Sequence, residues 1–250
     1  MINSNSNIEK EFYNKIGKII GWDFSKMKCE IIDNSKFQYF DEINNNISED
    51  TILLDIGTGG GEKLTNLISN KCLLKIGTDF SKEMIKSAKN NNQNSRIYFL
   101  EMDSNDIKFP NSFFDIVTAR HTPFNLKEVY RLLKEDGIFI SEQIDEDDCK
   151  ELKQIFGRGQ GLNAKDKLID IIKSDMKETK YKKIEFFNIL QEEYYKTEGD
   201  LLFLLNNTPI IPDFGKVKGD YGKFDKYVKE NTHKKGILLN RHLFGIKVIK

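Results

Sequence analysis

The sequence predicts an α/β fold with an open, doubly wound, mostly parallel sheet. Two observations carry this prediction. Short apolar runs alternate with helix-length segments between residues 51 and 144, and a glycine-rich turn, "GTGGG", follows the first of these runs. Parallel strands need long crossover connections, whereas antiparallel hairpins need only tight turns, so this alternation favours strands that run side by side in one direction.

The predicted strands of the alternation are short and rich in apolar residues, as strands buried on both faces are. They are 51–56, 72–79, 96–103, 113–120 and 137–144. The predicted helices between them are 61–69, 81–89 and 126–133. Ser81 is the expected N-cap of the second helix, because its hydroxyl can accept a hydrogen bond from the first turn.

The flanks of the alternation follow a different pattern. Two helices with mixed faces, 8–20 and 33–46, precede it. After it we expect helices at 147–156 and 165–174, a strand at 183–195, a helix at 200–207 and a loop at 208–216, with the last strand inside 236–250. Residues 198–235 therefore read as an insertion before the last strand of a single domain spanning 1–250.

Composition narrows the classes of function. Lys plus Arg and Asp plus Glu both number 39, so the net charge is zero and a nucleic-acid partner is unlikely. No apolar run approaches the length of a membrane span, and the polar N-terminus lacks a signal-peptide pattern. Cys29, Cys72 and Cys149 show no CxxC spacing, which favours reduced thiols in a cytoplasmic protein.

The glycine-rich turn indicates a ligand site. Ligands of open α/β sheets bind outside the carboxyl ends of the strands, where this turn is expected. The dinucleotide fingerprint GxGxxG does not fit, because its third glycine would fall on Glu62 or Leu64. The spacing that does fit is an acidic residue followed by GxGxG, namely Asp55, Gly57, Gly59 and Gly61. Glycines in such a turn suggest that something approaches the backbone closely enough for a Cβ to be in the way, and the alternative is a structural role in the turn.

With these residues in this order, the chain resembles the class I S-adenosylmethionine-dependent methyltransferases over about residues 50–145. The resemblance implies a Rossmann-like, seven-stranded methyltransferase fold with an antiparallel last strand, and S-adenosyl-L-methionine as cofactor with no metal. It also implies that the glycine turn holds the methionine part, that Asp79 accepts the ribose hydroxyls and that Asp103 meets the adenine amino group. The alternatives are a local helix cap for Asp79 and an ordinary turn for Asp103.

The full set of cofactor-binding residues implied by the resemblance lies at the ends of four predicted strands. It comprises Asp55, Gly57, Thr58, Gly59, Gly61, Asp79, Phe80, Asp103, Ser104 and Arg120.

Fewer sequence features indicate which residues would bind the methyl acceptor. His121 follows the fourth strand, where it would act as a base or orient the substrate, or else lie as a hydrogen-bonded rim residue. Over the whole chain, the pattern resembles bacterial methyltransferases of small molecules. That likeness implies that residues 1–46 form a lid with 198–235, and that Trp22, Phe24 and Phe214 line the acceptor site together with His121.

Three functions remain open at this point. The first is methyl transfer to a small-molecule acceptor. The second is methyl transfer to RNA or protein. The third is a non-catalytic module that binds S-adenosylmethionine. Arg120, Arg158 and Arg241 would meet an anionic substrate, or would be paired with carboxylates of the chain itself.

Overall fold

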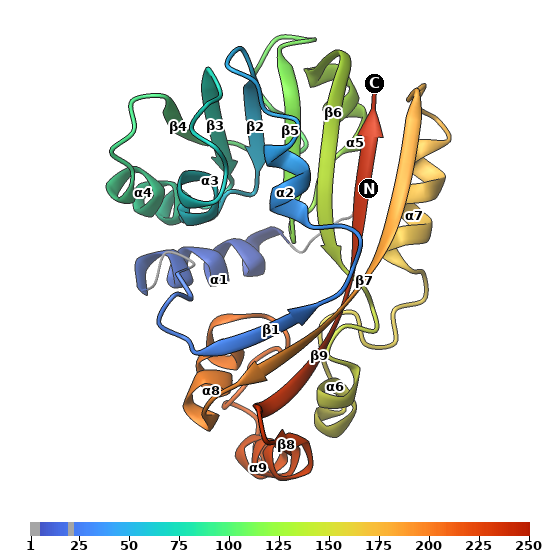
Figure 1. The fold of residues 1–250 in the computed structure, drawn as a ribbon. Helices are drawn as coiled ribbons and strands as arrows, with labels where there is room; N and C mark the ends of the chain where they lie inside the picture. Colours follow the sequence, from blue (N-terminus) through green and yellow to red (C-terminus); the bar gives the residue numbers. More distant parts are fainter. Residues whose placement is uncertain (1–5, 20–22) are drawn as a thin grey trace.

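The computed structural model describes residues 6–19 and 23–250. Over these residues, one nine-stranded sheet has the order β1-β7-β9-β6-β5-β2-β3-β4, and the short β8 pairs with β9 (Figure 1). The strands are β1 (Cys29–Asp33), β2 (Ile52–Ile56), β3 (Leu74–Asp79), β4 (Ile97–Glu101), β5 (Phe114–Arg120), β6 (Leu133–Ile144), β7 (Lys183–Tyr195), β8 (Thr232–His233) and β9 (Gly236–Ile249).

Helices occupy most of the connections between these strands. They are α1 (Ser6–Ile19), α2 (Tyr39–Asn44), α3 (Glu62–Asn66), α4 (Lys82–Asn91), α5 (Leu126–Leu132), α6 (Lys150–Phe156), α7 (Leu168–Met176), α8 (Glu198–Asn207) and α9 (Asp220–Asn231). Ser81 caps α4 as predicted, since its hydroxyl accepts the Met84 N–H at 3.3 Å.

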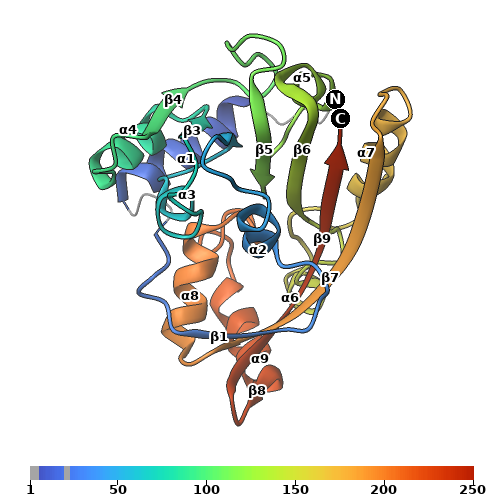
Figure 2. The ribbon, with the colours of Figure 1, turned by 45° about the horizontal axis from the view of Figure 1, so that its top comes forward.

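The central part of the sheet is parallel, as the alternation predicts. β2 pairs in parallel with β3 and β5, β4 lies outside β3, and β6 lies beside β5. β9 runs antiparallel to β6, which confirms the antiparallel last strand. In Figure 2 the arrowheads of β5 and β9 lie at opposite ends of the sheet, so the carboxyl ends of the parallel strands point toward α8 and α9.

Helices cover both faces of the parallel strands, which makes the sheet doubly wound. On one face α5 and α7 contribute Val129 and Ile172 to an apolar core. On the other face α2, α3 and α4 contribute Ile43, Leu64 and Ile85 to a second core. The strands between the two cores are nearly continuous in apolar residues because neither of their faces meets water.

A lower lobe (residues 23–33, 145–162 and 190–242) extends this sheet. β7 and β9 are 13 and 14 residues long and continue past the parallel strands (Figure 1). Over them α6, α8 and α9 pack a third core that includes Leu152 and Phe224. The lobe therefore shares its sheet with the rest of the chain and lies on the side of the carboxyl ends.

The prediction of a helix over residues 33–46 is wrong in part. Cys29–Asp33 is strand β1, paired antiparallel with the end of β7, and α2 begins only at Tyr39. The sheet accordingly has nine strands in the described part of the chain, where seven were expected. The hydrogen bonds of β1 come from β7, more than a hundred residues away in sequence, so local patterning does not reveal the strand.

A buried ion network holds the lower lobe together. Arg241 on β9 donates from Nε to Asp148 Oδ1 at 2.8 Å and from Nη1 to Glu193 Oε1 at 2.9 Å. Asp148 Oδ1 also accepts the backbone N–H of His242, and Glu193 Oε2 accepts the Tyr195 hydroxyl. One guanidinium thus compensates two carboxylates that are both buried.

We expect Arg241→Met to lower the free energy of unfolding by about 3–5 kcal/mol, because removing one partner leaves the buried carboxylates uncompensated. Urea denaturation followed by circular dichroism measures the change. The control is Lys182→Met, which removes an exposed ion pair with Asp136 and should cost less than about 1 kcal/mol. Equal losses in the two variants would contradict a stabilising role for the network.

Candidate functional site

The glycine-rich turn connects the carboxyl end of β2 to α3. Gly57, Gly59 and Gly61 have φ angles of +68°, +59° and +78°, which residues with a Cβ rarely adopt. A Cβ at Gly57 would lie 2.3 Å from Thr122 Oγ1, and one at Gly61 would lie 2.6 Å from Phe99 Cζ. At Gly57 and Gly61 the close approach expected from the sequence is thus made by the chain itself. A substitution at Gly59 would strain the backbone whether or not a ligand binds.

Asp55 lies on β2 just before this turn. The side chain is buried, and its Oδ1 accepts a hydrogen bond from Thr118 Oγ1 at 2.8 Å. Burial raises the pKa of Asp55 to about 6, although the Thr118 hydrogen bond acts in the opposite direction. Near neutral pH the group is therefore a carboxylate, held at the carboxyl edge of the sheet.

Asp79 ends the neighbouring strand β3 and reaches the turn. Its Oδ2 accepts the Gly59 N–H at 3.0 Å, and its Oδ1 accepts the Ser81 N–H at 2.9 Å. Burial raises the pKa of Asp79 to about 6. The carboxylate thus has a structural role at the start of α4. Each oxygen retains a second lone pair, so this role is compatible with binding hydroxyl groups of a ligand.

The remaining predicted cofactor residues lie along the same edge. Asp103 follows β4 and is exposed, with Oδ1 accepting the Asn105 N–H at 2.8 Å. Ser104 comes next and is half-buried. The Phe80 ring lies edge-on to Tyr13 of α1, with 5.9 Å between ring centroids. Contact of these residues with a cofactor remains a prediction.

Three buried polar atoms near the glycine turn form no well-aligned hydrogen bond, although the Tyr39 hydroxyl lies beside Thr118 and the Thr58 hydroxyl beside Asp55. They are the Tyr39 hydroxyl, the Thr58 hydroxyl and Glu62 Oε1. Burial also raises the pKa of Glu62 to about 7. Buried polar groups in folded proteins are rarely left unpaired, and each such group calls for an explanation. A polar ligand at the turn would supply the missing partners.

A charged cluster lies next to the turn at the ends of β5 and β6. Glu142 Oε1 is 2.8 Å from Arg120 Nε and 3.1 Å from His121 Nε2. Burial alone would raise the pKa of Glu142, but Arg120 and His121 outweigh burial and hold the pKa at about 2. Burial, with help from Arg120, lowers the pKa of His121 to about 4. At neutral pH Glu142 is thus an anion and His121 is neutral.

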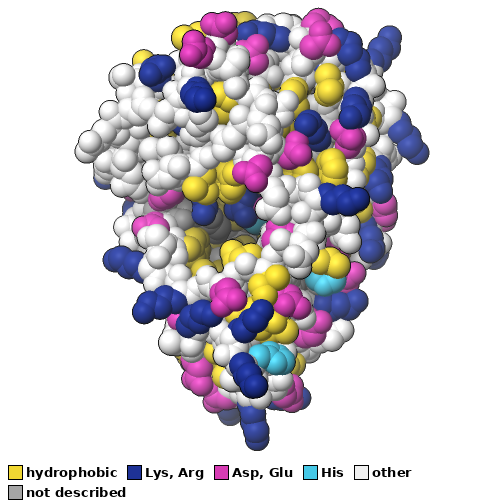
Figure 3. Space-filling model, viewed as in Figure 1, with side chains coloured by type: hydrophobic (Ala, Val, Ile, Leu, Met, Phe, Trp, Pro, Cys, Tyr) yellow, Lys and Arg dark blue, Asp and Glu magenta, His cyan; other side chains and the backbone are white. Residues whose placement is uncertain are grey.

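A hollow lies on the face of the molecule shown in Figure 3, between α2 above and β1 below. Lys or Arg side chains and hydrophobic side chains are visible inside it. α1 crosses the carboxyl edge beside it, where Asn14 Oδ1 accepts the Ser81 hydroxyl at 2.7 Å. Within the lower lobe, Asp200 Oδ1 accepts the Lys28 N–H at 2.9 Å, which ties residues 23–33 to the start of α8.

The predicted acceptor-lining residues differ in their surroundings. Phe24 is half-buried, and its ring lies 5.8 Å from that of Phe203. Phe214 is buried in the core of the lower lobe, with its ring 5.8 Å from that of Phe156, which are contacts typical of core packing. Trp22 lies outside the described residues.

The three arginines considered for an anionic substrate are all paired within the chain. Arg120 meets Glu142, Arg158 donates to Asp220 Oδ2 at 2.8 Å, and Arg241 holds the network of the lower lobe. These pairings favour the reading of the arginines as partners of the chain's own carboxylates.

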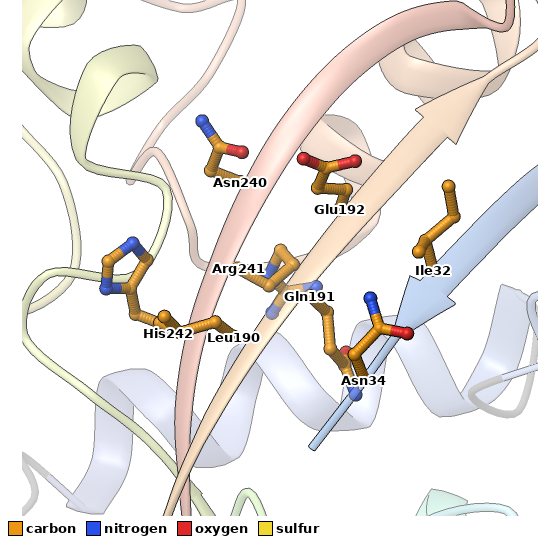
Figure 4. A pocket seen from close by; sticks show the side chains of 8 residues that line it. All are labelled: Ile32, Asn34, Leu190, Gln191, Glu192, Asn240, Arg241 and His242. Atoms are coloured by element: carbon orange, nitrogen blue, oxygen red, sulfur yellow. The ribbon is translucent and has the colours of Figure 1, made fainter.

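A separate pocket of about 300 Å³ lies on the antiparallel part of the sheet. Figure 4 shows its side chains, contributed by β1, β7, β9 and the residues next to them, including Asn34, Glu192 and Asn240. It is distant from the glycine turn in the strand order, and its Arg241 is already engaged by carboxylates. We therefore place the candidate site at the carboxyl edge of the parallel strands.

Comparison with known proteins indicates which family the parallel part of the chain is similar to. Residues 54–141, from β2 into β6, match a family described as methyltransferase domain. The uncharacterised protein MJ1252 of Methanocaldococcus jannaschii is 31% identical over 135 residues, which are 52% of this chain and 49% of that protein. The uncharacterised methyltransferase YcgJ of Bacillus subtilis is 32% identical over 99 residues, covering 35% of this chain and 38% of YcgJ.

Residues 54–141 of the chain are thus similar to a methyltransferase domain. Solved structures support the fold of this domain. The crystal structure of YcgJ superimposes with a TM-score of 0.57 at 18% identity, over 84% of this chain and 95% of YcgJ. The [4+2]-cyclase SpnF superimposes with a TM-score of 0.58 at 12% identity, over 97% of this chain and 94% of SpnF.

The chain spans about half or less of the length of the curated relatives that it matches, namely 49%, 41% and 38%. In the part of the chain that the structure describes, no helix is long and apolar enough to cross a membrane. Nor do residues 6–19 and 23–250 contain three or more His, Cys, Asp or Glu side chains grouped to hold a metal ion.

Sequence reasoning missed three residues of the candidate site. Glu142 carried a signal, because it is a charged residue inside an apolar strand of 137–144. Glu62 was noticed only as a mismatch to the dinucleotide fingerprint. Tyr39 carried no signal, because its place at the site depends on how α2 packs against the sheet.

We expect the affinity of the protein for S-adenosylhomocysteine to fall as the pH drops below about 6, by up to about tenfold per pH unit. The raised pKa means that Asp79 takes up a proton in this range, and a protonated carboxyl group is a poorer acceptor for ribose hydroxyls. Calorimetric titration between pH 5 and 8 measures the dependence. In Asp79→Asn the dependence should vanish, and its persistence there would assign it to another group such as Asp55.

Proposed function

We propose that the protein transfers a methyl group from S-adenosyl-L-methionine to a small-molecule acceptor at the carboxyl edge of its sheet. The observation that carries this proposal is the set of buried polar atoms of Tyr39, Thr58 and Glu62 around the glycine turn, none of which forms a well-aligned hydrogen bond. These atoms include donors and an acceptor, which suits a ligand that carries both an ammonium and a carboxylate group.

The charges at the turn suit this cofactor. S-adenosylmethionine carries a cationic sulfonium and an α-ammonium group, and Asp55 and Glu62 are carboxylates beside the turn. Asp79 would accept the ribose hydroxyls and Asp103 the adenine amino group, as the resemblance implies. When bound, the cofactor supplies an activated methyl group, so the protein need only align an acceptor, exclude water and receive a proton.

The acceptor is proposed to bind in the hollow between α2 and β1. Residues 1–46 and 198–235 would close over it as a lid, with Phe24 on its apolar side and His121 as the base. The contact between Phe24 and Phe203 supports a closed arrangement of the two segments. Zero net charge favours a small acceptor over RNA. The three free cysteines suit the cytoplasmic setting that we propose.

A second candidate function comes from the likeness to SpnF, which is named a cyclase although it shares this fold. Fold similarity at such low identity does not carry an activity. A binding module without turnover is the other alternative. Release of S-adenosylhomocysteine separates methyl transfer from both, because neither a cyclase nor a binding module consumes the cofactor.

The first test is cofactor affinity. We expect Asp79→Ala to weaken binding of S-adenosylhomocysteine by about 1.5–3 kcal/mol, the range for hydrogen bonds to a charged group. Calorimetry measures the affinity, and thermal unfolding of the unliganded variant measures its stability. If the folded variant binds normally and only its stability falls, the carboxylate is a helix cap and not a ribose ligand.

The second test is turnover. Release of S-adenosylhomocysteine is followed with panels of small amines, phenols, carboxylates and thiols, and separately with RNA and with protein substrates. Turnover with a small molecule is the expected result. Turnover restricted to RNA or protein would refute the acceptor class, and tight cofactor binding without any release would favour the binding module.

A further inference from the structure

Glu142 is a buried charge that the fold itself does not require. On β6 it has Ile140 and Ile144 as its neighbours on the same face, and both belong to the apolar packing of that face. Across the strand pair it faces Gly245 of β9, and the space above that glycine is filled by Phe37. A carboxylate is costly at such a position unless it is compensated, so its presence calls for a partner.

The partners of Glu142 are Arg120 and His121, which are consecutive at the end of β5. Arg120 Nε lies 2.8 Å from Glu142 Oε1 and supplies the positive charge. His121 Nε2 lies 3.1 Å from the same oxygen. Both contacts are short but bent, since neither meets the angle of a good hydrogen bond. A small rotation of the imidazole aligns it, as often happens when a ligand enters an active site.

The backbone also directs His121 toward Glu142. The His121 N–H donates to the Glu142 carbonyl at 2.9 Å, and His121 has a φ of +52°. A positive φ is uncommon for a residue with a Cβ, and strained residues of this kind cluster at functional sites. The strained turn thus holds the imidazole over the carboxylate.

From this geometry we infer that Glu142 fixes the tautomer of His121, with the proton on Nε2 and the lone pair on Nδ1 facing the acceptor. Nε2 is sealed from solvent, while 22% of the His121 side chain remains exposed. The accessible part of the ring is therefore not Nε2. An ionised carboxylate accepts hydrogen bonds but cannot donate them, so the nitrogen next to it carries the proton.

This arrangement selects the class of acceptor, a consequence that rests on the proposed methyl transfer. A neutral amine or hydroxyl attacks the methyl carbon, and a bond from N or O to carbon forms. The sulfur–carbon bond breaks, and its electron pair stays on sulfur, which becomes a thioether. The proton of the acceptor passes to His121 Nδ1, and Glu142 stabilises the resulting imidazolium. A thiolate or a tertiary amine has no proton to give and would need no such base.

Three charged groups act on the His121 ring from the strands around it. They are Arg120 on β5, Glu142 on β6 and Arg241 on β9. Burial and the two arginines lower the pKa of the imidazole and oppose its protonation, whereas Glu142 acts in the opposite direction and favours the cation that forms on proton transfer. Glu142 is therefore a positioning residue, and its removal should change the tautomer of His121 even without substrate.

The test is a long-range ¹H–¹⁵N correlation spectrum of the imidazole rings, recorded with and without S-adenosylhomocysteine. The chain has only three histidines, and His121→Asn assigns the signal. We expect a single Nε2–H tautomer in the wild type between pH 6 and 8, and a rising share of Nδ1–H in Glu142→Gln. A wild-type Nδ1–H tautomer, or the same ratio in both proteins, would overturn the inference.

The matched control is Glu128→Gln. It removes the carboxylate of another Glu–Arg pair, with Arg131 on α5, and should leave the His121 tautomer unchanged. If Glu142→Gln does not fold because it leaves Arg120 unpaired, the double variant Arg120→Gln with Glu142→Gln, which removes both charges, replaces it in the test. The expected result is again a rising share of the Nδ1–H tautomer.

Kinetics give an independent reading. With an N–H or O–H acceptor from the panel, Glu142→Gln should slow the release of S-adenosylhomocysteine by about 10²-fold at unchanged KM for the cofactor, within the usual range for general-base catalysis. Turnover of thiols alone would refute the acceptor class. Absence of both cofactor binding and turnover would instead refute the proposed function, while the tautomer of the free protein would still test the role of Glu142.

Discussion

The constraint on which the candidate site depends is the parallel register of β2, β3, β5 and β6. Because these strands run in one direction, their carboxyl ends meet at one edge of the sheet. That single fact brings together Asp55, Asp79, Arg120 and Glu142, which are spread over nearly ninety residues of sequence. No other part of the described chain gathers buried carboxylates from so many strands. The parallel strand order thus determines where the site lies, and the side chains at the strand ends determine its charge and hydrogen-bonding groups.

The lower lobe extends the sheet on the side of this open edge. β7 and β9 are long enough to leave the parallel strands and carry α6, α8 and α9 below them. Buried charges lie on this side of the sheet, namely Glu142 at the edge and Asp148, Glu193 and Arg241 in the lower lobe. Charges in such a place are costly, and well-packed apolar residues would serve stability as well.

The parallel core was predictable from the sequence because its signals are local. Apolar runs, the cap at Ser81 and the glycine turn each depend on a few neighbouring residues. β1 and Tyr39 were not predictable, because their roles arise from pairing with β7 and from packing of α2 on the sheet. The sequence correctly indicates that the backbone at Gly57 and Gly61 leaves no room for a Cβ, but it does not show which atoms fill that space. Thr122 and Phe99 occupy the space that a cofactor was expected to fill.

The central claim is that S-adenosylmethionine binds on the glycine turn with its ribose at Asp79. The most direct measurement is a crystal structure of the protein with S-adenosylhomocysteine. We predict that both ribose hydroxyls lie within hydrogen-bond distance of the Asp79 carboxylate, and that the amino acid end of the ligand pairs with the Tyr39 hydroxyl and Glu62 Oε1. A ligand bound elsewhere, with Asp79 bonded only to Gly59 and Ser81 and those buried atoms still unpaired, would contradict it.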